Sequence, residues 1–242
     1  MNAIKAVRLV KRYGSITAVD DLNLEIKQGE LFALLGLNGA GKSTTIRMLS
    51  CITLPTEGDA FVGGYSIKEN SCQVKRSIGV SPQENAVAPN LTVKENLELI
   101  CGIQGFTRDK TKVKVSELSE RFGLDSVLNR RASKLSGGYA RRLSIAMALI
   151  GEPEILFLDE PTLGLDVLAR QELWNIIRAL KRNTTIILTT HYMEEAEALS
   201  DRIGIMKNGN LLAIGTVDEL KEKAGTNDFE TAFVSIVNGG VI

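Results

Sequence analysis

The fold is set by residues 31–44, which read LFALLGLNGAGKST. The first five residues form a continuous apolar run, the pattern of a strand that is buried on both faces of a parallel sheet. Glycines follow at once, and a helical pattern comes after them. Similar apolar runs recur at residues 155–158 and 185–188, each followed by polar residues and then by a helical pattern. This repeated order of strand, loop and helix predicts an α/β fold built on a parallel sheet.

The loop at residues 36–44 has the spacing GxxxxGK[ST], between a predicted strand and a predicted helix. Its glycines permit positive φ angles, so successive N–H groups at a helix N-terminus can surround a β-phosphate. Lys42 would reach the β- and γ-phosphates, and the Ser43 hydroxyl would bind Mg²⁺. The residues expected to bind the nucleotide here are Gly36, Asn38, Gly39, Ala40, Gly41, Lys42, Ser43 and Thr44. The alternative is a glycine-rich turn with an exposed lysine.

Two acids end the apolar run at residues 155–158. Strand alternation aims the side chains of Asp159 and Glu160 in different directions, so they can hold separate roles. Asp159, at the carboxyl edge of the sheet, can reach a magnesium shell, and Glu160 can polarise a water in line with a γ-phosphate. A strand that ends in two solvated acids is the alternative. None of these features separates a transporter ATPase from a nucleotide kinase, a GTPase or a helicase.

Three further segments complete the predicted architecture. Apolar residues mostly alternate with polar ones at 19–26, which predicts an antiparallel strand with one covered face. Residues 84–152 are mostly helical in pattern, with Thr92 and Glu95 spaced as a capping box, and we expect a helical insert there. Within it, the sequence Leu-Ser-Gly-Gly at 135–138 opens a helix whose unpaired N–H groups can bind an anion. A capped helix with flexible glycines is the other interpretation of that segment.

Composition narrows the class of protein. Lys plus Arg number 29 and so do Asp plus Glu, so there is no positive surplus for neutralising phosphate backbones, and we expect no nucleic-acid partner. The longest apolar runs fall short of the roughly 20 residues that span a bilayer. The N-terminal residues lack a secretory apolar region. The three cysteines show no metal-ligand spacing, and we expect buried thiols in a reducing compartment.

The ordered motifs GxxxxGKST, a glutamine after a strand, LSGG, LFLDEP and a histidine resemble the ATP-binding cassette (ABC) family. The resemblance covers residues 1 to about 220. It implies an α/β P-loop NTPase with a RecA-like parallel-sheet core, an N-terminal antiparallel β subdomain and the helical insert. Residues 1–220 would form the ATP-binding domain and residues 221–242 a C-terminal helical tail, whose apolar face would pack on its own domain or dock a partner.

The resemblance also gives roles to single residues. Tyr13 would stack on the adenine of ATP, although a surface or core tyrosine is the alternative. Gln83, at the entry to the insert, would contact Mg²⁺ and the attacking water. His191, the only histidine, would donate a hydrogen bond to the γ-phosphate or position Glu160, whereas a lone histidine is ordinarily structural.

A second copy of the cassette is implied as well. Family members bind ATP between two cassettes arranged head to tail, so Ser136, Gly137 and Gly138 would bind the partner's nucleotide and Asp166 would cross the interface. We favour a homodimer over pairing with a paralogue. Two positions depart from the family, because Tyr139 stands where glutamine or methionine is common and Val167 where proline is frequent.

The expected function is therefore that of an ATP-hydrolysing subunit that drives a separate membrane permease, held on the cytoplasmic face of the membrane through that permease. Residues 55–67, 91–105 and 228–236 resemble exporter cassettes of the drug-resistance and sodium-efflux type. The transported substrate is not specified by the chain. The main alternative is a soluble ABC-type ATPase acting on DNA or ribosomes, which would ordinarily carry a coiled-coil insertion, tandem cassettes or a basic extension.

Overall fold

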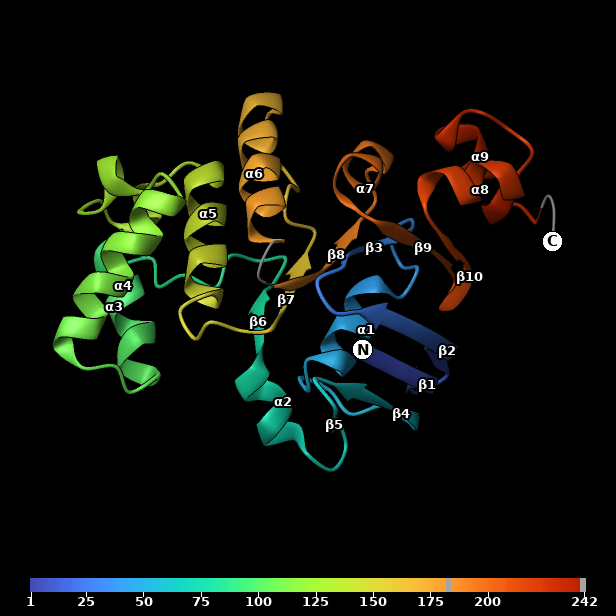
Figure 1. Cartoon of the computed structure of the whole chain (residues 1–242), viewed down its shortest axis with the longest axis horizontal. Helices are drawn as coiled ribbons and strands as arrows, with labels where there is room; N and C mark the ends of the chain where they lie inside the picture. Colours follow the sequence, from blue (N-terminus) through green and yellow to red (C-terminus); the bar gives the residue numbers. More distant parts are fainter. Residues whose placement is uncertain (182–183, 240–242) are drawn as a thin grey trace.

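A six-stranded sheet forms the centre of the computed structural model, which describes residues 1–181 and 184–239 (Figure 1). Its strand order is β10-β9-β3-β8-β7-β6, and β3 pairs in parallel with both β8 and β9. The strands are β3 (Leu31–Leu35), β6 (Ile78–Ser81), β7 (Ile155–Asp159), β8 (Thr185–Thr190), β9 (Arg202–Lys207) and β10 (Asn210–Gly215). Only β10 is antiparallel to its neighbour. The predicted α/β class with a parallel core is confirmed.

A second sheet, of order β2-β1-β4-β5, is antiparallel throughout. It consists of β1 (Asn2–Tyr13), β2 (Ile16–Lys27), β4 (Glu57–Val62) and β5 (Tyr65–Ser66). The predicted alternation in β2 is confirmed, because Val19, Leu22, Leu24 and Ile26 are buried. This sheet covers one face of the central sheet.

The two faces of the central sheet belong to two cores, because successive side chains of a strand point to opposite faces. Leu31, Ala33 and Leu35 pack in a cluster with helices from the middle and the end of the chain. Phe32 and Leu34 pack in a second cluster with the antiparallel sheet and with α1 (Lys42–Leu49) and α2 (Ser71–Ser77). The end of β3 is therefore fixed from both sides.

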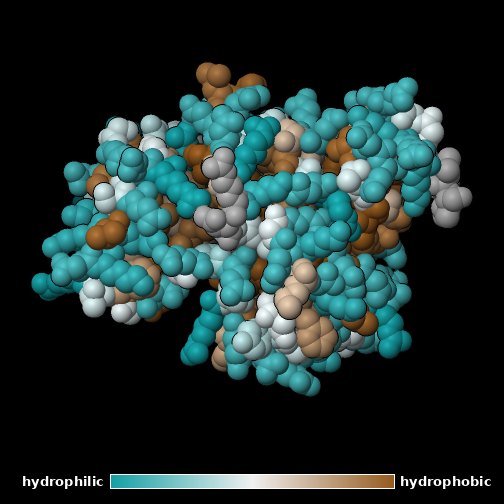
Figure 2. All heavy atoms as spheres, viewed as in Figure 1, coloured by the Kyte–Doolittle hydropathy of each residue, from teal (hydrophilic) through white to brown (hydrophobic). Residues whose placement is uncertain are grey.

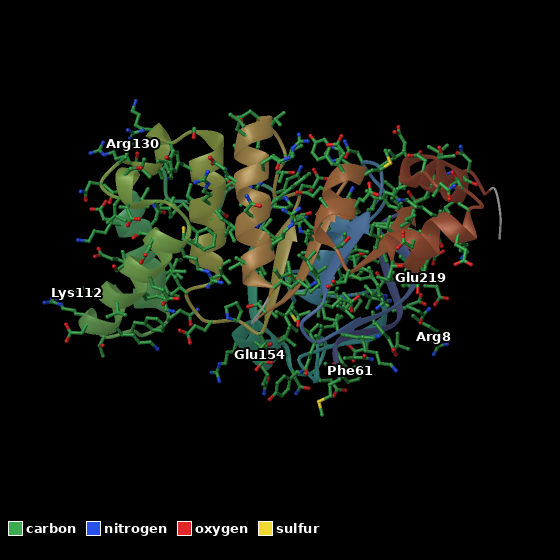
Figure 3. All side chains as sticks on the ribbon, turned by 45° about the horizontal axis from the view of Figure 1, so that its top comes forward. Arg8, Phe61, Lys112, Arg130, Glu154 and Glu219 are labelled. Carbon is green, nitrogen blue, oxygen red and sulfur yellow. The ribbon has the colours of Figure 1, made fainter. Side chains whose placement is uncertain are left out.

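The helices of residues 84–152 lie together at one end of the molecule (Figure 1). They are α3 (Val93–Ile103), α4 (Arg108–Arg121) and α5 (Gly137–Ala148), with short 3₁₀ helices at Asp125–Val127 and Ala132–Lys134. Thr92 and Glu95 form the predicted capping box of α3. In Figure 3, Lys112 and Arg130 mark this end of the molecule, and Glu219 marks the C-terminal helices at the other.

The C-terminal helices pack on the rest of the chain. These helices are α6 (Val167–Leu180), α7 (Met193–Leu199), α8 (Val217–Lys223) and α9 (Phe229–Val237). The apolar face of α9 is buried, and Phe229, Phe233 and Ile236 of that face belong to the first core.

Two further expectations concern the thiols and the membrane. Cys101 is buried, as expected, but Cys51 is only partly covered and Cys72 is exposed, because α2 buries only Val74. The expectation of three buried thiols is therefore wrong for Cys72 and, in part, for Cys51. No helix among the described residues combines the length and apolarity needed for a bilayer crossing.

Candidate active site

The glycine loop joins β3 to α1 at the carboxyl edge of the central sheet. Gly39 and Gly41 have φ angles of 81° and 104°, which side chains rarely adopt. A Cβ atom on Gly41 would lie 2.5 Å from the carbonyl oxygen of Ala18. A Cβ atom on Gly36 would lie 2.4 Å from the carbonyl oxygen of Met206. Glycine is thus needed at Gly41 for both conformation and space, and at Gly36 for space.

A cavity of about 690 Å³ opens over this loop. This volume is within the range of small-molecule sites. The predicted site residues that line it are Tyr13, Asn38, Gly39, Ala40, Gly41, Lys42, Ser43, Thr44, Gln83, Glu160 and His191. The cavity therefore collects residues from β1, the glycine loop, the segments after β6 and β7, and the end of β8.

Lys42 is the buried cation of the cavity, with 4% of its surface exposed. Its Nζ donates hydrogen bonds to the carbonyl oxygens of Gly36 (2.8 Å) and Leu37 (3.2 Å). It also lies 3.6 Å from Oε1 of Glu160. Burial lowers the pKa of Lys42, and the carboxylates of Glu160 and Asp159 oppose that effect. The ammonium group is thus held beside an open cavity by two main-chain carbonyls and by the more distant carboxylate of Glu160.

Asp159 lies at the end of β7 beneath the cavity and binds two hydroxyl groups. Ser43 Oγ donates to its Oδ1 over 2.9 Å, and Thr189 Oγ1 donates to the same oxygen over 2.5 Å. Thr189 also accepts a hydrogen bond from the main-chain N–H of Glu160, at 3.0 Å. The hydroxyl and carboxylate oxygens of Ser43 and Asp159 are donors of the kind that a hard cation such as Mg²⁺ prefers.

Glu160 turns away from the strand, with a φ angle of 46°, and lines the cavity. Three side chains approach its carboxylate. Lys42 lies near Oε1, the Nε2 of Gln83 is 3.5 Å from Oε2, and Nδ1 of His191 is 3.4 Å from Oε2. The His191 contact lacks hydrogen-bond geometry, which leaves Nδ1 without a hydrogen-bond partner among the described residues. Asp159 and Glu160 thus have different partners and different positions.

Other predicted residues lie outside the cavity. Ser136, Gly137 and Gly138 begin α5, which Figure 1 shows separated from α1 by α6. Ser136 occupies the N-cap position of α5, but its side chain accepts no hydrogen bond from the first turn. Asp166 is the N-cap of α6 and accepts a hydrogen bond from the N–H of Ala169, at 2.9 Å.

Several residues around the site carry no clear signal in the sequence. Ile16, Thr17, Ala18, Leu163 and Asn208 also line the cavity, brought there by the antiparallel sheet, the segment between β7 and α6, and the turn after β9. Thr189 could have been noticed, because two threonines end an otherwise apolar strand beside β7.

Arg141 could not have been noticed in the same way. It belongs to a pair of arginines within a helix, where solvated charges are common. It is nevertheless 4% exposed and reaches the segments after β6 and β7.

Comparisons with known proteins agree with this arrangement. The family described as ABC transporter matches residues 19–163. The probable multidrug ABC transporter ATP-binding protein YbhF of Escherichia coli (strain K12) is 40% identical over 97% of this chain and 42% of YbhF. The daunorubicin/doxorubicin resistance ATP-binding protein DrrA of Streptomyces peucetius is 42% identical over 93% of this chain and 68% of DrrA. The chain thus spans less than half the length of YbhF and about two thirds of DrrA.

A solved structure gives the same result. The dimeric structure of a post-hydrolysis state of the ATP-binding cassette MJ0796, bound to ADP and Pi, matches with a TM-score of 0.80 and 27% identity. The match covers 88% of this chain and 98% of that chain. With a family match over more than half of the residues, the resemblance noted in the sequence is confirmed: this chain is a nucleotide-binding cassette and belongs to the ABC transporter family.

Proposed function

We propose that this chain hydrolyses ATP and that it drives a separate membrane permease. The observation that carries the proposal is the convergence of Lys42, Gln83 and His191 on the carboxylate of Glu160 at the edge of the glycine-loop cavity. In one cavity, a cation and an imidazole can stabilise phosphate charge, and an amide and a carboxylate can orient a water and accept its proton, which phosphoryl transfer to water uses.

ATP would enter with its phosphates on the glycine loop. The N–H groups at the start of α1 and the positive end of its dipole attract the β-phosphate. Lys42 would exchange the carbonyl oxygens of Gly36 and Leu37 for phosphate oxygens, a charge-assisted and therefore stronger interaction. Tyr13 has 46% of its surface exposed at the cavity, and although Lys11 Nζ lies 4.9 Å from the centre of its ring, the ring would stack on adenine.

A magnesium ion fits the oxygen donors beside the loop. Ser43, Asp159 and Gln83 would hold it. The described residues include no group of three His, Cys, Asp or Glu side chains able to hold a metal unaided, so phosphate and water would complete the shell. When bound, the ion neutralises charge on the β- and γ-phosphates.

Hydrolysis would proceed through Glu160. Its carboxylate accepts a hydrogen bond from the attacking water and takes a proton as the new oxygen–phosphorus bond forms. The bond from the γ-phosphorus to the bridging oxygen breaks, and ADP leaves with that electron pair. Gln83 would orient the water, and His191 would donate a hydrogen bond to the γ-phosphate, for which an imidazole nitrogen at the cavity is suited.

The start of α5 would serve the ATP of a second cassette. Thr92, Thr107 and Thr216 cap their helices through their side chains, whereas the Ser136 hydroxyl does not bond to the first turn of its helix. It therefore stays available for a phosphate, together with the N–H groups of Gly137 and Gly138.

Exposed apolar residues support such a dimer. Val167 and Leu168 at the start of α6 are 68% and 76% exposed, and Figure 2 shows hydrophobic side chains at the free end of that helix. The MJ0796 cassette is itself dimeric. We favour a homodimer, in which Asp166 would lie at the interface; pairing with a paralogue is the alternative.

The membrane partner and the direction of transport rest on relatives. YbhF is named for multidrug transport and DrrA for daunorubicin and doxorubicin resistance. The permease would then be an exporter, with this chain on the cytoplasmic face of the membrane. In the test, a tagged chain is expressed together with a multi-span membrane protein encoded beside it, and the two should co-purify. Recovery of the chain alone would favour a cassette ATPase that acts without a permease.

The test of hydrolysis is Glu160→Gln. The substitution keeps the shape of the side chain and leaves Lys42 and the loop in place, so ATP affinity should stay within about twofold. Phosphate release should fall by about 100- to 10,000-fold, the contribution of a general base. Glu154→Gln is the matched control, because Glu154 is exposed and precedes β7, far from its catalytic end (Figure 3). Normal turnover in Glu160→Gln would overturn the assignment.

A further inference from the structure

Arg141 is a buried cation that the hydrolysis scheme does not use. It lies in the second turn of α5, five residues after Ser136, and only 4% of its surface is exposed. Its neighbour Arg142 instead pairs with Glu172 of α6 and lies over the ring of Tyr139. The two adjacent arginines therefore do different things.

The guanidinium of Arg141 binds main-chain carbonyls rather than carboxylates. Nη1 donates to the carbonyl oxygen of Pro82 over 2.6 Å, and Nη2 donates to that of Gln83 over 2.6 Å. A longer bond of 3.4 Å joins Nη2 to the carbonyl oxygen of Glu160. One planar, rigid group thus joins the segment after β6 to the segment after β7.

Burying the charge of Arg141 costs free energy. Burial lowers the pKa of Arg141, while Asp159, Glu195 and Glu160 oppose that effect from a distance. A guanidinium keeps its charge at such a site. If the position only filled space, an apolar side chain would fill it without that cost.

The hydrogen bonds of Arg141 affect the position of Gln83. The main-chain carbonyl oxygen of Gln83 accepts a hydrogen bond from Arg141, and its side-chain Nε2 lies 3.5 Å from Oε2 of Glu160. The residue is therefore held from its main chain and directed at the carboxylate with its side chain. Without the first contact, Gln83 would lie in a loop between β6 and α3 that can move relative to Glu160.

We propose that Arg141 is a positioning residue for hydrolysis: through the carbonyl oxygens of Pro82, Gln83 and Glu160 it fixes Gln83 against Glu160. Because Arg141 sits on α5, a shift of the Ser136 end of that helix also moves Gln83. Contact of α5 with the partner's nucleotide is thereby linked to the cavity of its own chain. This inference rests on the proposed ATPase function.

The test uses Arg141→Gln and Arg141→Lys in the full chain, with ATP affinity, turnover and thermal unfolding measured for each. A misplaced Gln83 slows the chemical step, so kcat should fall by about 10- to 100-fold in Arg141→Gln. ATP affinity should change by less than about threefold, because no loop contact is lost. Arg141→Lys should recover part of kcat, since an ammonium can still donate to one or two of the carbonyls.

A matched control separates positioning from loss of a buried cation. Lys114 is 7% exposed on α4 and pairs with Glu117 and Glu152, away from the cavity. Lys114→Gln should lower the unfolding temperature while the folded protein keeps its kcat. If Arg141→Gln does not fold, Arg141→Lys carries the comparison.

A double-mutant cycle identifies the route through Gln83. Gln83→Ala removes the side chain that Arg141 is proposed to position, so Arg141→Lys should lower kcat by less than about twofold in that background. Wild-type kcat in the Arg141 variants, or a full and independent loss in the Gln83→Ala background, would overturn the proposal. Normal turnover in Glu160→Gln would instead refute the proposed mechanism, whatever the Arg141 variants do.

Discussion

The starts of α1 and α5 are alike in sequence and different in setting. Glycine is the N-cap of α1 and the first two residues of α5 are glycines, and neither helix has a side-chain hydrogen bond at its N-cap. The start of α1 faces a cavity that holds a buried lysine and a buried glutamate of the same chain. The start of α5 is exposed at Ser136 and Gly137 and lies outside that cavity. The proposed phosphate site at α1 thus has charged side chains of the same chain around it, whereas the one proposed at α5 is open to a second chain.

The largest difference should appear when the cation of the α1 site is removed. Lys42→Ala deletes a charge-assisted contact to phosphate, worth about 2–3 kcal/mol, so ATP affinity should fall by about 30- to 150-fold. Equilibrium binding of a fluorescent ATP analogue measures it. Lys5→Ala, which removes an exposed lysine paired with Glu25, should bind as the wild type does. Equal affinity in Lys42→Ala would show that phosphate binds elsewhere.

Substituting one glycine at the start of each helix should lower the free energy of unfolding much more at α1 than at α5. Gly41→Ala forces a side chain into a φ angle of 104° and against the Ala18 carbonyl, at a cost of about 1–3 kcal/mol. Gly137→Ala places its Cβ at an ordinary 3.6 Å from Leu165, so its unfolding free energy should stay within about 0.5 kcal/mol of wild type. Urea unfolding compares them. Equal costs would mean that α5 is as constrained as α1.

A smaller effect concerns a buried acid outside both helix starts. Glu195 is fully buried in α7 and accepts a hydrogen bond from Trp174 over 3.1 Å. Burial raises the pKa of Glu195, against the opposing effect of the hydrogen bond from Trp174. The stability from this raised pKa is fully present below the pKa of the unfolded chain. It is lost as the pH rises through the folded value, because the buried carboxyl must then ionise.

Glu195→Gln should therefore gain stability over wild type as the pH rises. The amide still accepts from Trp174 and carries no charge, so the gain near neutral pH should be on the order of 1 kcal/mol. Denaturant unfolding at acid and at neutral pH measures the difference. A variant that is destabilised equally at both would show that the carboxylate is well paired in the folded protein.

The sequence predicted what depends on local pattern. Buried runs located β3, β7 and β8, and Thr92 with Glu95 located the start of α3. Most of the cavity lining followed from the motifs, because the carboxyl ends of parallel strands meet at one edge.

What the sequence could not predict depends on contacts between distant segments. Arg141 binds carbonyls more than 50 positions earlier in the chain, at Pro82 and Gln83. No periodicity distinguishes it from Arg142, whose partner is an exposed acid. The exposure of Cys72 was not predicted either, because a helix such as α2, which buries only Val74, has no apolar periodicity that shows which side chains are covered.

Mixing two inactive variants tests most directly whether the start of α5 completes the ATP site of a second chain. Lys42→Ala disables the cavity, and Gly137→Glu places a negative charge where the partner's γ-phosphate is expected; the glutamate suits the helix dipole, so α5 should fold. In a head-to-tail homodimer, a mixed pair has one site with both defects and one with neither. Mixing equal amounts should restore about one quarter of wild-type ATP turnover, because half of the dimers are mixed and each has one intact site. Turnover no higher than the average of the two variants alone would contradict the account.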